Sequence, residues 1–137
     1  MTMKRQLFIL SFLIAVLMVS CIKDDVRGTD LESGDFLPDF EVVMNDGSTV
    51  SDESLKGSVS VIVLFSTICP DCQQVLPVIQ EIYEEYTQKG VIFALVSREQ
   101  GKEDIDDYWA ANGLHIPYSA QLDRNVYEKF AKSYIYK

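Results

Sequence analysis

The sequence contains few of the side chains that usually build metal or nucleic-acid sites. Its one histidine, His115, precedes a proline in a predicted loop, and we interpret it as incidental rather than catalytic. One histidine and three cysteines are too few for a four-ligand zinc site once one cysteine is used elsewhere. Lys and Arg total 12 against 21 Asp and Glu, and phosphate contacts dominate nucleic-acid affinity. We therefore expect no metal, no organic cofactor and no nucleic-acid partner.

A long membrane-spanning run is also missing. The longest apolar stretch, Leu7–Val19, follows Lys4 and Arg5 and precedes a small residue, Ser20. A bilayer span needs roughly 20 apolar residues, and this stretch is shorter. A basic start, a short apolar centre and a small residue before the cut are typical of a secretory signal. We predict that residues 1–20 are a signal peptide, with a short transmembrane anchor as the alternative.

Cys21 stands directly after this segment. The run Leu17–Cys21 resembles a bacterial lipobox, although Met18 occupies the position that usually holds leucine. The resemblance implies that Cys21 is lipidated and that residues 21–35 form a lipoprotein tether. A structural disulfide of Cys21 is the competing interpretation. Lys23-Asp24-Asp25 resembles the acidic tether of some surface lipoproteins, or is a solvated linker. The expected location is a bacterial cell envelope, lipid-anchored on the periplasmic side of a membrane, the outer membrane or the cell surface.

Residues 36–137 have the length of one domain. Apolar and polar residues alternate over Phe36–Val50 around Asn45-Asp46-Gly47, a strong signal for a β-hairpin. The sequence then changes to longer apolar runs, so the hairpin is expected to precede the main sheet.

Two apolar runs, Val59–Phe65 and Val91–Val96, predict strands covered on both faces. Between them, apolar residues at helical spacing predict a helix that begins at Pro70 and ends before Gly90. Pro77 is expected to kink this helix. A strand, a helix and a strand in this order predict a right-handed parallel crossover, and hence an α/β fold.

The last third predicts further alternating elements. We expect a helix over Glu103–Ala111 that stops at Gly113, a strand over Ile116–Leu122 and a helix over Arg124–Tyr134. Trp109 is interpreted as a core residue of the first of these helices.

Cys69 and Cys72 are the residues most able to carry chemistry. A thiol–disulfide site needs an exposed attacking thiolate and a nearby second thiol. At a helix start, unpaired N–H groups and the helix dipole are expected to lower the pKa of Cys69, while Asp71 opposes the thiolate. Cys72, one turn later, is expected to be more buried and to resolve the mixed disulfide. We predict a reducing couple; a purely structural disulfide is the alternative.

Several features together resemble the TlpA/ResA-type envelope reductases, which are thioredoxin-like proteins of the redoxin (AhpC/TSA) superfamily. They are the stretch Phe40–Gly57, the following strand, the Cys-Pro-Asp-Cys motif, Pro77 and the stretch Asn112–Ile135. The resemblance covers residues 36–135 and implies a three-layer α/β/α thioredoxin-like fold. It also implies a thiol–disulfide oxidoreductase that acts on disulfide-containing envelope proteins and takes electrons from a thiol donor.

The chain departs from this family pattern near its end. Relatives carry a cis-proline loop that faces the cysteines, then two strands and a last helix. Here Tyr136 stands near the expected proline, and no sequence follows Lys137. We expect a domain truncated before the cis-proline, with impaired activity and with Val59–Phe65 as an exposed apolar edge. Alternatively, Pro117 is the cis-proline. The acid that assists the resolving thiol in relatives is also not evident, because Val63 and Val75 are apolar.

Two other functions remain open. Ser66, three residues before Cys69, matches the Ser/Thr of thiol peroxidases, but Ile62 stands where their proline is expected. An inactive lipoprotein fragment is the non-enzymatic alternative.

Overall fold

The computed structural model of the protein describes residues 30–131. Its elements are β1 (Glu41–Val43), β2 (Thr49–Ser51), α2 (Asp52–Leu55), β3 (Ser60–Phe65), α3 (Pro70–Tyr86), the 3-10 turn η1 (Thr87–Lys89), β4 (Ile92–Ser97), α4 (Lys102–Asn112), β5 (Tyr118–Ser119) and α5 (Tyr127–Phe130). The predictions for the signal peptide, for Cys21 and for residues 132–137 lie outside this range. Within it, no helix has the length and apolar character needed to cross a membrane.

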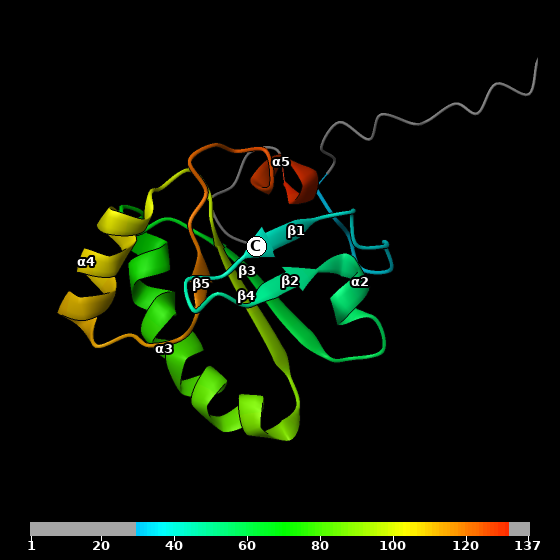
Figure 1. Cartoon of the computed structure of the whole chain (residues 1–137), viewed down its shortest axis with the longest axis horizontal. Coiled ribbons are helices and arrows are strands. Elements are labelled where there is room, and N and C mark those ends of the chain that lie inside the picture. Colours follow the sequence, from blue (N-terminus) through cyan, green and yellow to red (C-terminus); the bar gives the residue numbers. More distant parts are fainter. Residues whose placement is uncertain (1–29, 132–137) are drawn as a thin grey trace, which may run out of the picture.

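A parallel sheet with the strand order β3-β4-β5 forms the centre of the molecule. β3 and β4 pair from Ser60 with Ile92 to Phe65 with Ser97. Each new strand is added on the same side of the previous one, and right-handed crossovers then bring both connecting helices to one face. Figure 1 accordingly shows α3 and α4 together on one side of the sheet. The predicted parallel crossover is confirmed.

The two faces of the sheet belong to two separate cores. Phe65, Phe93 and Leu95 pack with residues of α3 and α4, including Cys72 and Trp109. Alternate residues of the same strands point to the other face. There they pack with the β1–β2 hairpin, α2 and α5, and this second cluster consists of Phe40, Val42, Met44, Val50, Leu55, Leu64, Ala94, Val96, Tyr127, Phe130 and Ala131. The sheet therefore lies between two layers, as the predicted three-layer fold requires, and the second layer is a hairpin with two short helices.

The predicted hairpin is present but shorter than its alternating pattern. β1 and β2 pair antiparallel, and the Met44 N–H donates to the Ser48 carbonyl at 2.8 Å across the turn. Gly47 has a φ of 86°, a left-handed conformation that favours glycine. The turn also reaches the main sheet: the Asn45 N–H donates to the Tyr118 carbonyl at 2.7 Å, and the Tyr118 N–H donates to Asn45 Oδ1 at 3.0 Å. These two hydrogen bonds hold the hairpin against β5.

The last two predicted elements are too long. Only Tyr118 and Ser119 form β5, because Pro117 before them lacks an N–H group and the Gln121 N–H after them donates to the Ser97 hydroxyl. The helix expected over Arg124–Tyr134 is the single turn α5, since the backbone of Ala131 is extended and its side chain enters the core.

α3 continues through Pro77 as one helix of 17 residues, and the kink expected at this proline stays a prediction. One expectation for β3 needs correction. β3 is not covered on both faces along its length, because only Leu64 and Phe65 are buried. Within residues 30–131 β3 has no strand on its outer side. Among the described strands it therefore lies at the edge of the sheet.

Candidate functional site

The two cysteines lie at the junction of β3 and α3. Cys69 is the residue that precedes the first turn of α3, and Pro70 occupies the first helical position. The Cys69 side chain makes no capping hydrogen bond, so its sulfur is not used to satisfy the helix. Cys72 lies one turn into the helix, and the two sulfurs are free thiols. The pair therefore occupies the predicted position at a helix start.

Both thiols are more buried than a freely accessible nucleophile. Cys69 is 8% exposed, which corrects the expectation of an exposed thiol, because its side chain belongs to the core cluster under α3. Cys72 is more buried still, at 3%. The pKa of Cys72 is raised to about 11, mainly by burial and to a smaller extent by the neighbouring Cys69 and the charge of Asp71, while a hydrogen bond from the Ser66 backbone acts in the opposite direction. Cys72 is thus a protonated thiol at neutral pH.

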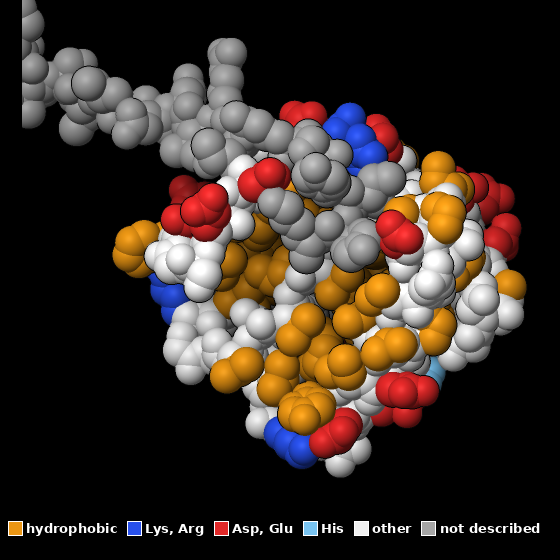
Figure 2. All heavy atoms as spheres, turned by 180° about the vertical axis from the view of Figure 1, so that it is seen from behind, with side chains coloured by type: hydrophobic (Ala, Val, Ile, Leu, Met, Phe, Trp, Pro, Cys, Tyr) orange, Lys and Arg blue, Asp and Glu red, His pale blue; other side chains and the backbone are white. Residues whose placement is uncertain are grey.

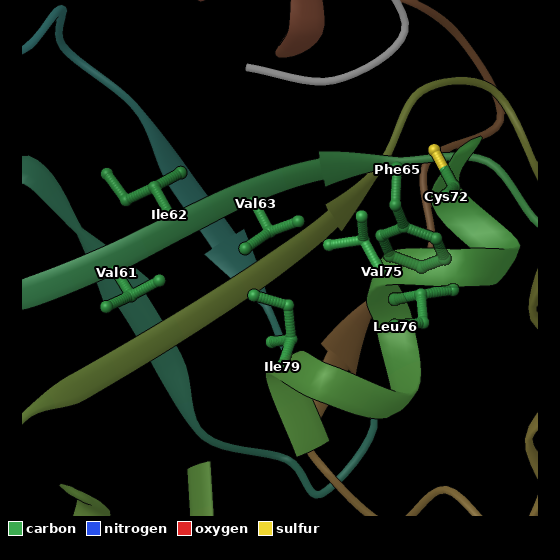
Figure 3. Close-up of a pocket in the computed structure, with 8 residues that line it drawn as sticks. All are labelled: Val61, Ile62, Val63, Phe65, Cys72, Val75, Leu76 and Ile79. Carbon is green, nitrogen blue, oxygen red and sulfur yellow. The ribbon is translucent and has the colours of Figure 1, made fainter. Parts of the chain in front are cut away.

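An apolar groove of about 240 Å³ leads to Cys72. Its walls come from β3 and α3, and they consist of Val61, Ile62, Val63, Phe65, Cys72, Val75, Leu76 and Ile79. Figure 3 shows the Cys72 sulfur at the end of the groove near the last residues of β3. The rear view in Figure 2 shows hydrophobic side chains gathered around a hollow on that face of the molecule. None of the described residues that line the groove is a carboxylate, in line with the apolar residues noted at positions 63 and 75.

A tight turn, Ser66–Cys69, connects β3 to the cysteines. The Cys69 N–H donates to the Ser66 carbonyl at 3.2 Å and closes the turn. Gln100, in the loop after β4, binds Thr67 twice: its Oε1 accepts from the Thr67 N–H at 2.6 Å, and its Nε2 donates to Thr67 Oγ1 at 2.8 Å. Gln73 Nε2 donates to the Thr67 carbonyl at 2.7 Å. Every polar group of Thr67 therefore has a defined partner.

No sequence pattern indicated that Gln100 and Gln73 bind Thr67. Gln100 follows Thr67 by 33 positions and belongs to no motif. The only local hint is the polar pair Ser66-Thr67 between an apolar strand and the cysteines, and both residues are buried.

His115 lies in a different cluster from the cysteines. Its Nε2 is 2.8 Å from Gln80 Nε2 and 3.0 Å from Glu84 Oε1, beside the middle of α3. Trp109 is a core residue, as predicted, and its Nε1 donates to the Ile116 carbonyl at 2.9 Å. The alternative that Pro117 is the cis-proline is wrong, because residues 30–131 contain no cis peptide bond.

Comparisons with known proteins agree with this geometry. The model of the AhpC/TSA family matches residues 33–133. The chain belongs to the AhpC/TSA family. Thiol-disulfide oxidoreductase ResA of Oceanobacillus iheyensis is 31% identical over 115 residues, which are 81% of this chain and 59% of that protein. The chain thus spans less than two thirds of the length of this relative.

Solved structures show the same thioredoxin-like fold. A thioredoxin-family thiol:disulfide interchange protein from Chlorobium tepidum is 25% identical with a TM-score of 0.58, and the match covers 82% of this chain and 77% of that one. A candidate protein disulfide isomerase from Bacteroides thetaiotaomicron is 21% identical with a TM-score of 0.70, over 77% of this chain and 67% of that one. The thioredoxin-like α/β fold of this family member is therefore shown.

Proposed function

We propose that this protein is a thiol–disulfide oxidoreductase in which Cys69 attacks and Cys72 resolves. The observation that carries the proposal is the position of two free thiols at the start of α3, with Cys69 ahead of the first turn and Cys72 inside it. The similarity to ResA of Oceanobacillus iheyensis supports the same chemistry.

The first step uses Cys69. Its thiolate attacks one sulfur of a substrate disulfide, the substrate S–S bond breaks, and the departing thiolate takes a proton. The product is a mixed disulfide between Cys69 and the substrate. N–H groups at the start of α3 favour negative charge at this position.

The second step uses Cys72. Its thiol gives up its proton and attacks the Cys69 sulfur, and the second substrate thiol leaves with a proton. Two electrons pass from the protein to the substrate, and a Cys69–Cys72 disulfide forms. An external thiol donor then returns the pair to its reduced state. Because burial raises the pKa of Cys72, this thiol is protonated in the reduced protein before the substrate reacts.

The test measures reduction of a model disulfide by the reduced protein. Cys69→Ala should abolish turnover, whereas Cys72→Ala should stop after one step and accumulate a mixed disulfide visible by mass spectrometry. Turnover that persists in Cys69→Ala would refute the proposal. Faster consumption of peroxide than of disulfide would instead identify a thiol peroxidase. Intact, titratable thiols without any turnover would support the inactive alternative.

We also propose that Cys21 anchors the protein in the bacterial envelope, where its substrates are disulfide-containing exported proteins. The lipobox-like run before Cys21 supports this. Cells fed a labelled fatty acid should label the wild-type chain but not Cys21→Ser, and that variant should leave the membrane fraction. Equal labelling of both proteins would contradict the anchor.

A further inference from the structure

Gln100 lies in the loop after β4, and its side chain holds the turn that connects β3 to the cysteines. Its side-chain amide makes two hydrogen bonds to one residue, Thr67, with the acceptor and the donor both used. Such a paired arrangement fixes the orientation of both partners, because neither can rotate without losing a bond. The Thr67 side chain is buried, so water cannot readily replace the lost partner.

Thr67 belongs to the turn that leads into the cysteines, so holding Thr67 also restrains the backbone near both thiols. Thr67 is the second residue of the Ser66–Cys69 turn, so its position sets where the backbone enters Cys69. The residue before it, Ser66, contributes a backbone hydrogen bond to Cys72. Gln100 therefore restrains the backbone segment that positions the two sulfurs, although its side chain bonds to Thr67 and not to either cysteine.

The loop that carries Gln100 is itself anchored. Gln100 forms an isolated antiparallel bridge with Gln121, and Ser97 Oγ donates to the Gln100 carbonyl at 3.1 Å. The Gln121 N–H in turn donates to Ser97 Oγ at 2.8 Å. These hydrogen bonds link the ends of β4 and β5 and thereby hold the loop that carries Gln100 in place.

We propose that Gln100 is a positioning residue for the thiol–disulfide reaction, which it serves by holding Thr67 and thereby the Ser66–Cys69 turn against the two cysteines. The inference rests on the proposed function, but its effect on the thiols can be measured without turnover. Loss of the two hydrogen bonds between Gln100 and Thr67 should let the turn shift, and a misplacement of about 1 Å at a reacting group can slow a reaction by roughly 100-fold.

The experiment compares four variants in the full chain with Cys21 replaced by serine. Gln100→Leu removes both bonds to Thr67. Gln100→Glu keeps a carboxylate that accepts from the Thr67 N–H and from its hydroxyl. Thr67→Val removes only the hydroxyl bond. Gln121→Leu is the matched control, because Gln121 shares the bridge but its side chain donates to Ser119 Oγ and not to the turn.

Two readouts are measured on each reduced protein: the alkylation rate of each cysteine as a function of pH, and the rate of mixed-disulfide resolution. In Gln100→Leu we expect resolution to slow by roughly 10-fold or more and the pKa of Cys72 to rise, because the turn that carries Ser66 is released. Gln100→Glu should restore most of both values. Thr67→Val should lie between, and Gln121→Leu should match the wild type.

The inference is overturned if Gln100→Leu and Gln121→Leu change the alkylation profiles equally, or if Gln100→Glu gives no rescue while it folds as stably as the wild type. If the wild type itself lacks turnover, the proposed function fails, and the alkylation profiles alone decide whether Gln100 positions the thiols.

Discussion

Cys72 is the residue whose properties depend most on its surroundings. Apolar side chains of β3 and α3 surround it, and within residues 30–131 no carboxylate lines the groove where it lies. Burial therefore dominates its titration and raises its pKa to about 11. In an unfolded chain the same thiol would lose its proton near its ordinary value of 9.0.

This shift predicts an alkaline loss of stability in the reduced protein. Between pH 9.0 and about 11 the folded state keeps a proton on Cys72 that the unfolded state has lost. The free energy of unfolding should therefore fall as pH rises through this window. Denaturant unfolding of the reduced protein at several pH values measures it.

Cys72→Ala is the control, because it lacks the titrating thiol but keeps the other alkaline groups. Its stability should fall less steeply over the same window. Parallel pH profiles for the two proteins, or a thiolate signal from Cys72 at its ordinary pKa, would contradict the assignment.

Among the elements, α3 and the loop before β5 are joined by one side chain. Gln80 is buried on α3, and its Oε1 accepts from the His115 N–H at 2.9 Å and from the Ile116 N–H at 2.8 Å. The loop carries Ile116, which is fully buried, so these backbone groups have little access to water. One glutamine thus satisfies the backbone at the point where the chain enters β5.

Gln80→Leu should therefore destabilise the protein by about 1–3 kcal/mol, the usual cost of leaving a buried donor without its partner. Thermal or denaturant unfolding measures the loss. Glu84→Gln is the matched control, since it changes a more exposed neighbour of Gln80 and leaves both backbone bonds in place. An equal effect of the two substitutions would show that the backbone bonds contribute nothing measurable.

The whole molecule has one apolar face that its described residues leave open. Along α3, the side chains of Val75, Val78, Ile82 and Tyr86 recur at helical spacing and are 36–52% exposed. They continue the groove beside β3, whose outer edge has no strand partner within residues 30–131. Open strand edges and apolar stripes favour association between molecules.

We expect the 137-residue chain to associate as its concentration rises, and Val78→Lys to reduce this association. Analytical ultracentrifugation measures it. Leu122→Lys is the matched control, because Leu122 is 88% exposed and follows β5, away from α3. If both lysines reduce association equally, the added charge and not the α3 face is responsible.

The periodicity of apolar residues predicted where helices and strands lie better than it predicted which of their side chains are buried. It located α3, β3 and β4, because an apolar residue every three or four positions or in a continuous run is a local property. It did not show that Leu76 is buried while Val75 is partly exposed, since that depends on what packs against the helix. It also overestimated β5 and α5, where a hydrogen bond from Gln121 to the Ser97 hydroxyl and the burial of Ala131 limit the length.

The placement of Cys69 and Cys72 at a helix start followed from the sequence alone, because a strand, a proline and a helical repeat are encoded within a few neighbouring residues. The same holds for the hairpin turn at Gly47, whose conformation favours glycine. Only the tertiary structure decided how deeply the two thiols are buried and which side chain holds the turn before them. The burial arises from the packing of separate elements around the thiols, and the turn is held because Gln100 binds Thr67, which lies 33 positions earlier in the chain; no local pattern encodes either contact.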